Sequence, residues 1–218
     1  MVVVGAVKPL SKHPRITLTF TRMACSGRIS CEEKQIILDE HNRLRQLVAL
    51  GQIHGQPGAA NMMEMLWDDE LADVAQKWAD SCAETHDNYR NVRRFAVGQN
   101  IARTWTTRPP GPYDSEPNWR RQISGWFNEV QHYHTGYSKT TGHYTQLVWS
   151  DTFLIGCGYS FYYDPAKGYT KNYVCNYGPS DSTTVAIKSD TQQHSSLGQL
   201  KECNFIRCLC IFSAFLSR

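Results

Sequence analysis

The segment FLIGCGYSFYYDPAKGYTKNYVCNY, residues 153–177, has two runs of strand-forming residues on either side of a turn. Residues 153–163 and 169–177 are rich in aromatic and β-branched side chains, which is typical of strands. The intervening DPAKG, residues 164–168, has the composition of a turn. The segment therefore predicts an antiparallel β-hairpin.

The hairpin also predicts a register and a disulfide. If Ala166 is the centre of a five-residue loop, Cys157 faces Cys175 and Tyr159 faces Tyr173. Facing residues of an antiparallel pair lie about 4.5 to 5.5 Å apart at Cα, a distance that a disulfide accepts. We therefore expect a bond between Cys157 and Cys175.

Three helices are predicted before the hairpin. Ser30 and Glu33 form a capping box that starts the first helix, and Gly51 ends it. The second helix begins after Asp68 or Asp69 and has the clearest apolar periodicity. Its apolar positions are Leu71, Val74, Ala75, Trp78, Ala79 and Cys82. The third helix places Trp119, Ile123, Trp126 and Val130 on one side.

The remaining segments complete the predicted topology. Residues 52–61 and 106–118 are rich in Gly, Pro or Asn and predict loops. Residues 144–149 are aromatic and β-branched, so we expect a strand there that His143 leads into. Helices combined with a disulfide-locked hairpin indicate an α+β sandwich.

Composition excludes several classes of protein. The chain has 218 residues, of which 41% are hydrophobic and 20% charged, too apolar for a disordered chain. A net charge of +3 gives no concentrated basic face for nucleic acid. No stretch of 18 apolar residues occurs, so a transmembrane segment is not expected. The eight cysteines include no C-x-x-C pair, which favours disulfides in an oxidising compartment over buried cytosolic thiols.

The two ends differ from the middle of the chain. Residues 1–30 contain five Lys or Arg and no acid, but their short apolar run precedes the charges, the reverse of a secretory signal. We expect an N-terminal extension over 1–30, with an atypical or degraded signal region. A compact domain over 31–180 follows, and then a poorly ordered tail, 181–218, that contains cysteines.

Five motifs occur together in the middle of the chain. They are EHNRLR at 40–45, WDDELA at 67–72, GQNIA at 98–102, GHYTQLVW at 142–149 and YVCNYGPS at 173–180. In this order they resemble the CAP superfamily of cysteine-rich secretory proteins, venom antigen 5 allergens and plant pathogenesis-related class 1 proteins. Gln99 and the His86-Asp87 pair resemble the arthropod venom antigen 5 branch most.

The resemblance implies a three-layer α-β-α sandwich with a central antiparallel sheet. It also implies a cleft lined by two histidines and two acidic residues, which correspond here to His86, Gln99, Glu129 and His143. Gln99 is an amide where many members carry Glu, so it forms hydrogen bonds but supplies no charge. One acidic member of the cleft is therefore missing.

The cleft residues permit two interpretations. His86 and His143 are candidate ligands of a divalent ion such as zinc. Glu129 would accept a hydrogen bond from one imidazole and so orient that ring. Alternatively, the same residues form a hydrogen-bond network that joins helix to sheet. His41 lies on the apolar face of the first helix and is expected to be a core histidine bonded to backbone. Cys82 ends the second helix and is expected to pair with Cys25 or Cys31, a choice that remains open.

A binding function is favoured over catalysis. No G-x-S-x-G elbow occurs, the cysteines are expected to be oxidised, and Gln99 removes one acid of a carboxylate pair. We expect a secreted, extracellular, non-enzymatic protein that needs no cofactor. It would bind a sterol or fatty acid through the loop from Trp105 to Trp119, or an extracellular host protein. The alternative is a divalent-metal-binding protein with weak hydrolase activity.

Overall fold

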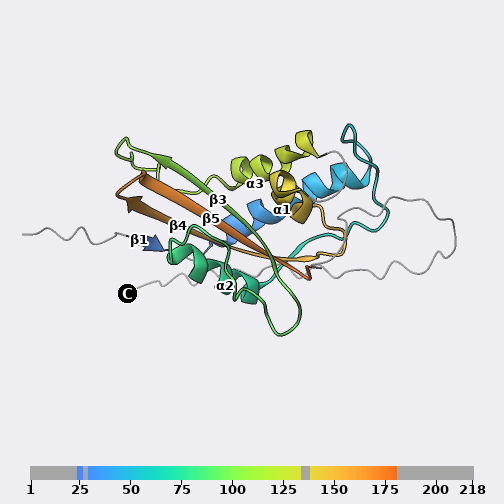
Figure 1. The fold of residues 1–218 in the computed structure, drawn as a ribbon, viewed down its shortest axis with the longest axis horizontal. Helices are drawn as coiled ribbons and strands as arrows, with labels where there is room; N and C mark the ends of the chain where they lie inside the picture. Colours follow the sequence, from blue (N-terminus) through green and yellow to red (C-terminus); the bar gives the residue numbers. More distant parts are fainter. Residues whose placement is uncertain (1–23, 27–28, 134–137, 181–218) are drawn as a thin grey trace, which may run out of the picture.

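A computed structural model describes residues 24–26, 29–133 and 138–180 of the chain (Figure 1). The predicted tail at 181–218 and most of the predicted N-terminal extension lie outside these residues. No helix in the described part is both long and apolar enough to cross a bilayer. The elements, in chain order, are β1 (Ala24–Ser26), α1 (Cys31–Ala49), β2 (Leu66–Trp67), α2 (Asp69–Asp80), β3 (Gly98–Thr106), α3 (Trp119–Phe127), η1 (Asn128–His132), η2 (Lys139–Thr141), α4 (Gly142–Leu147), β4 (Leu154–Asp164) and β5 (Gly168–Gly178).

The elements form three layers. The four longer strands are antiparallel neighbours in the order β1-β4-β5-β3, and the short β2 runs parallel to β4. Helix α2 covers one face of the sheet, whereas α1 and α3 lie on the other (Figure 1). The predicted α-β-α sandwich with a central antiparallel sheet is therefore confirmed, with β2 as its parallel exception.

The hairpin of β4 and β5 has the predicted register. Cys157 faces Cys175 and Tyr159 faces Tyr173. Cys157 and Cys175 form a disulfide with their Cα atoms 4.1 Å apart. Both cysteines are buried in the aromatic core on the α1 side of the sheet. The predicted bond is thus confirmed, and it crosses the centre of the domain.

The predicted helix ends are found in α1 and α2. The capping box is complete, because Ser30 accepts from the backbone of Glu33 while the Glu33 side chain accepts from the backbone of Ser30. Gly51 follows α1 with a φ of +66°, the left-handed conformation that favours glycine. Asp68 is the residue that caps α2, accepting from the backbone of Leu71 at 2.9 Å.

Two local predictions are wrong. Residues 142–147 form helix α4, so His143 lies in a helix and does not lead into a strand. Tertiary contacts override the β-propensity of this segment, because Glu129 caps the helix through two backbone N–H groups and Tyr144 and Leu147 are buried. The third helix ends at Phe127, which places Glu129 in the 3₁₀ helix η1.

Candidate functional site

The first half of the site is His143, at the beginning of α4. The Nδ1 atom of His143 lies 2.6 Å from Oε1 of Glu129. The other carboxylate oxygen accepts the backbone N–H groups of His143 at 3.0 Å and Tyr144 at 3.2 Å. Trp126 stacks on the imidazole, with ring centroids 6.1 Å apart. Because a carboxylate accepts, Nδ1 carries a proton, and Nε2 of the neutral ring has the free lone pair.

The second half is His86, in the loop between α2 and β3. Oε1 of Gln99 accepts from the backbone N–H of Asp87 at 3.0 Å and lies 3.0 Å from Nδ1 of His86. A backbone N–H can only donate, so this atom is the amide oxygen and Nδ1 of His86 must donate to it. The Gln99 amide nitrogen donates to Asn176 at 2.9 Å. Gln99 therefore fixes the orientation of His86 without a charge.

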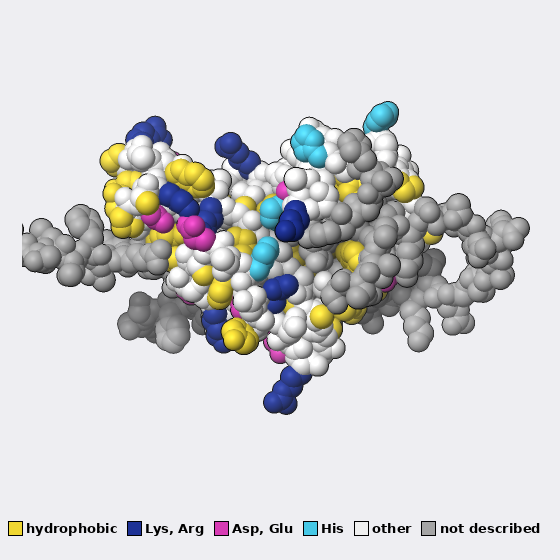
Figure 2. Space-filling view, in the orientation of Figure 1, with side chains coloured by type: hydrophobic (Ala, Val, Ile, Leu, Met, Phe, Trp, Pro, Cys, Tyr) yellow, Lys and Arg dark blue, Asp and Glu magenta, His cyan; other side chains and the backbone are white. Residues whose placement is uncertain are grey.

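Strand β3 lies at one edge of the described sheet. It joins the two halves of the site, because residues of β3 contact both His86 and His143. Gln99 and Asn100 are consecutive in β3, so their side chains point to opposite faces of the sheet. Gln99 holds His86 on the α2 side, and Asn100 donates to the carbonyl oxygen of His143 at 3.0 Å on the other. Figure 2 shows histidine side chains near the middle of one molecular face.

A buried hydrogen-bond chain extends from Asn100 into α1. Nδ1 of His41 lies 2.7 Å from the carbonyl oxygen of Ile37 and must donate to it. Nε2 of His41 therefore accepts from the Tyr177 hydroxyl at 3.0 Å, and that oxygen accepts from Asn100 at 3.4 Å. Burial lowers the pKa of His41 to about 4. His41 is thus the predicted core histidine bonded to backbone, and Tyr177 is the partner that sequence reasoning missed.

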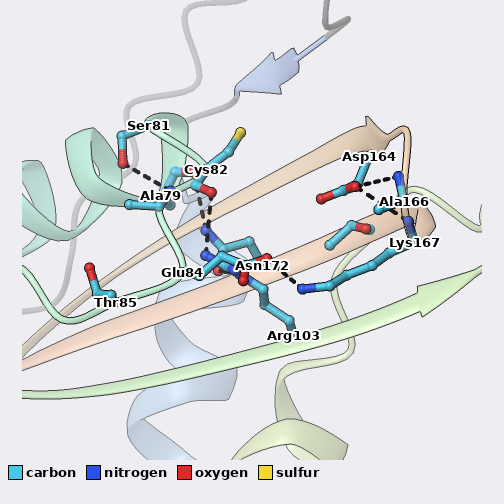
Figure 3. Close-up of polar contacts among 12 residues, drawn as sticks. Ala79, Ser81, Cys82, Glu84, Thr85, Arg103, Asp164, Ala166, Lys167 and Asn172 are labelled. Atoms are coloured by element: carbon cyan, nitrogen blue, oxygen red, sulfur yellow. Dashed lines mark hydrogen bonds and ion pairs between the residues drawn. The ribbon is translucent and has the colours of Figure 1, made fainter.

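Arg103 fixes the segment that leads to His86 (Figure 3). It donates to the carbonyl oxygen of Cys82 at 3.4 Å and pairs with Glu84 at 3.1 Å. Its cation lies beyond the C-terminus of α2, where the helix dipole favours positive charge. Lys167, in the turn between β4 and β5, pairs with the same carboxylate of Glu84. These contacts connect the loop before His86 to the sheet.

The remaining predicted disulfide is described only in part. Cys82 is buried at the end of α2 and has a φ of +54°. Cys31 is disulfide-bonded, but no bond joins it to Cys82 among the described residues. The side chain of Cys25 lies outside the described part, so the pairing of Cys82 with Cys25 stays a prediction.

The two imidazoles are the groups of the site that suit a metal ion. Nδ1 of each ring donates to an oxygen of a neighbouring side chain, which leaves Nε2 of the neutral ring as a ligand atom. No cluster of three or more His, Cys, Asp or Glu arranged for a metal occurs in the described part of the chain. Water would therefore have to complete the coordination of any bound ion, and the zinc site stays a prediction.

Comparisons with known proteins agree with this architecture. The model of the family described as "CAP: Cysteine-rich secretory protein family" matches residues 38–177. The chain is 42% identical to a venom allergen 5 of Tityus serrulatus, over 70% of this chain and 38% of that protein. It is 44% identical to a venom allergen 3 of Solenopsis invicta, over 71% of this chain and 70% of that protein. The chain thus spans well under half of the first relative.

A solved structure shares the fold. The crystal structure of NaASP2 with Zn²⁺ superimposes with a TM-score of 0.57 at 29% identity. The match covers 74% of this chain and 86% of that one. The fold expected from the five sequence motifs is therefore also that of an experimentally determined protein.

Proposed function

The chain belongs to the cysteine-rich secretory protein (CAP) family, and we propose that it is a secreted antigen 5-type protein that acts by binding an extracellular host protein, without chemical conversion. Secretion is supported by the buried disulfide between Cys157 and Cys175, because such bonds persist in oxidising compartments. It is also supported by relatives that are named as venom allergens.

The proposal rests on the hydrogen bonds that the side chains of Glu129 and Gln99 form in the site. Glu129 accepts three hydrogen bonds, from the His143 ring and from two backbone N–H groups of α4. Gln99 bonds through both its oxygen and its nitrogen and carries no charge. Both side chains hold imidazoles and backbone in place, so these two residues do not act as a pair of free carboxyl groups that supply an acid and a base. Side chains held in this way present a fixed surface to a partner.

The proposal is tested by measuring binding and turnover on the same variant. A double substitution, His86→Ala with His143→Ala, removes both imidazoles and leaves Gln99 and Glu129 in place. We expect the unmodified protein to bind an extracellular protein saturably, the double variant to bind it more weakly, and neither to convert peptide, glycan or lipid-ester substrates. Turnover by the unmodified protein that disappears in the double variant would instead make the protein an enzyme.

A lipid is the second candidate ligand, favoured by the loop between β3 and α3. Trp105, at the end of β3, is 56% exposed and Tyr113, in the loop, is 77% exposed, so this region offers apolar surface to solvent. The loop is held against the sheet, because the Tyr159 hydroxyl donates to the carbonyl oxygen of Ser115 at 2.6 Å. Saturable binding of a labelled sterol or fatty acid that is lost in a Trp105→Ala, Tyr113→Ala variant would establish this ligand class. Unchanged binding in that variant would exclude the loop.

Divalent-metal binding with weak hydrolase activity remains the alternative. It is favoured by the free Nε2 atoms of His86 and His143 and by the solved relative NaASP2, whose structure contains Zn²⁺. A bound zinc ion would polarise water or a carbonyl group. Calorimetric titration with zinc at neutral pH would support this alternative if His143→Ala abolished the heat signal. Equal signals from both proteins would exclude the cleft as the zinc site.

A further inference from the structure

Strand β3 has a partner strand on one side only. It pairs with β5, so its other side is an outer edge of the described sheet (Figure 1). The pairing with β5 continues without a bulge through the whole of Gly98–Thr106. Residues 98–100 are buried, whereas Thr104, Trp105 and Thr106 are exposed. A long and regular edge of this kind is a template for another strand.

The register shows which backbone groups of β3 point outward. Cys157 and Cys175 lie 4.1 Å apart at Cα, close to the spacing of about 4.5 Å for a facing pair that exchanges no backbone hydrogen bonds. The backbone groups of Cys175 therefore point away from β4 and toward Asn100, its facing residue in β3. Because this direction alternates along a strand, the next residues of β3 with outward N–H and C=O groups are Ile101, Arg103 and Trp105. No hydrogen bond to these outward groups occurs among the described residues.

The features that usually protect an outer strand are missing from β3. Such strands are commonly short, bulged, or guarded by proline or charged side chains. At the opposite edge of the sheet, β1 and β2 have only three and two residues. Strand β3 has nine residues and contains no Pro or Lys. Its charged side chain, Arg103, turns back onto the protein, where it contacts Asn172, Glu84 and the carbonyl oxygen of Cys82 (Figure 3).

The exposed part of β3 is complementary to itself when two copies pair antiparallel about Thr104. Thr104 then faces Thr104 of the second copy, a pair that is favourable in sheets. Arg103 faces Trp105 of the second copy, which brings a cation beside an aromatic ring. Both residues have outward backbone groups, so they can exchange hydrogen bonds in both directions. The two Arg103 side chains lie diagonally across the pair, and each is already paired with Glu84 of its own copy at 3.1 Å.

Other symmetric registers fit less well. Pairing about Arg103 would place two cations directly opposite each other, which is destabilising. Pairing about Ala102 would require Trp105 to face the buried Gln99. Pairing about Trp105 would extend beyond the end of β3 at Thr106. The register about Thr104 therefore uses the exposed part of the strand best.

We propose that the outer edge of β3 is a homodimer interface, at which two copies of the chain pair antiparallel about Thr104 and form one continuous sheet. A two-fold axis through Thr104, perpendicular to the sheet, relates the two copies. Helix α2 packs on β4 and β5, the strands that lie further inside the sheet. The interface goes beyond the proposed function, because the dimer can form without any host partner.

The test measures the oligomeric state of the full oxidised chain by sedimentation over a concentration series. Thr104→Lys and Thr104→Glu each place like charges opposite each other at the symmetry axis, so each should raise the dimer dissociation constant at least about tenfold. An equimolar mixture of the two variants should dimerise again, because Lys then faces Glu. Thr106→Lys is the matched control, since residue 106 faces Ala102 of the second copy and meets no like charge. Thermal unfolding of each variant shows whether folding is intact.

Hydrogen exchange supplies a second readout at single residues. Protection of the amides of Ile101, Arg103 and Trp105 should rise with protein concentration in the unmodified chain and not in Thr104→Lys. The amides of Ala102 and Thr104 point to β5, so their protection should not depend on concentration.

Three results would overturn the inference. A chain that sediments as a monomer at every concentration would reject the homodimer, and an extended peptide that then protected the amides of Arg103 and Trp105 would assign the edge to another protein. A dimer that Thr104→Lys and Thr106→Lys weaken equally would place the interface elsewhere. A mixture of the Lys and Glu variants that stays monomeric would reject the register about Thr104. None of these results bears on binding of a host protein, so the proposed function is tested separately.

Discussion

The two faces of the central sheet are packed by different means. The face toward α1 and α3 is an aromatic core around a disulfide, and its members include Trp119, Trp126, Tyr159, Tyr173, Tyr177, Cys157 and Cys175. The face toward α2 is joined by close backbone approach and side-chain amides. A Cβ atom added to Gly156 would lie 2.1 Å from the backbone nitrogen of Ala72. One added to Gly158 would lie 2.4 Å from Cα of Gln76.

This difference extends to the cleft, because each face supplies one histidine. His143 belongs to the aromatic face, where Trp126 stacks on its ring and the Glu129 carboxylate holds it. His86 belongs to the α2 face, where the neutral Gln99 amide holds it. The same geometric result, a ring oriented through Nδ1, is thus reached by a charged carboxylate on one face and by a neutral amide network on the other.

Adding a side chain at Gly156 is the change that should destabilise the packing of α2 on the sheet most. Gly156→Val places a side chain against the backbone of α2, so the helix must move away from the sheet. We expect a loss of about 4 kcal/mol or more in the free energy of unfolding. Ile155→Val, a buried neighbour that points to the other face, is the control and should cost about 1 kcal/mol. Denaturant titration measures both, and equal losses would show that α2 is not held by close approach.

Removing the disulfide should destabilise the aromatic face of the sheet. The bond between Cys157 and Cys175 closes a loop with a sequence separation of 18. The chain-entropy model gives such a loop about 3 kcal/mol, so the double variant Cys157→Ala, Cys175→Ala should lose this amount. Differential scanning calorimetry would record a lower melting temperature. A loss below about 1 kcal/mol would mean that aromatic packing holds the hairpin without the bond.

The buried His41 of helix α1 should make the free energy of unfolding depend on pH. Burial lowers the pKa of His41 from 6.5 to about 4, so the unfolded chain binds the proton more tightly than the folded chain. The stability that neutral His41 contributes is fully present above pH 6.5 and is lost as the pH falls toward 4. Between pH 6.5 and 5 this amounts to about 2 kcal/mol.

The measurement is the free energy of unfolding by urea titration across this pH range. His41→Gln keeps a hydrogen-bonding side chain but does not titrate, so its curve should be flatter than that of the unmodified protein. If the two curves are parallel, protonation of His41 does not couple to folding.

Exchanging the acceptors of the two histidines should give losses in the free energy of unfolding that are no larger than the effect of His41. Glu129→Gln removes the charge that holds His143 and two backbone N–H groups, and should cost about 2 kcal/mol. Gln99→Glu forces the Asn176 amide to turn and donate to a carboxylate, which should cost about 1 kcal/mol. Denaturant titration of both variants tests whether Glu129→Gln loses more free energy of unfolding than Gln99→Glu. A larger loss for Gln99→Glu would show that the neutral network is the more tightly constrained half.

The hairpin and the helix starts were predictable because local chemistry sets them. Facing positions around Ala166 gave the register of Cys157 with Cys175, and the structure confirms it. The capping box of Ser30 and Glu33 gave the start of α1, where both side chains bond to backbone. Patterns of this kind are contained within a few residues, so the sequence reveals them without knowledge of the rest of the fold.

The site was less predictable because distant residues build it. Residues 144–149 were predicted as a strand, yet residues 142–147 form a helix that Glu129 caps from a separate element. Strand β3 was not predicted, although it connects both halves of the cleft through Gln99 and Asn100. The family resemblance identified the candidate site residues, but the direction of each hydrogen bond follows only from the structure.

The orientation of the two imidazoles is tested most directly by long-range ¹H–¹⁵N correlation NMR of the ¹⁵N-labelled protein in mildly alkaline buffer, where histidine side chains are neutral. His86 and His143 should both show the tautomer with the proton on Nδ1, as the amide oxygen of Gln99 and the carboxylate of Glu129 require. A proton on Nε2 of either ring would contradict the account, because that half of the cleft would then be held by contacts other than those described.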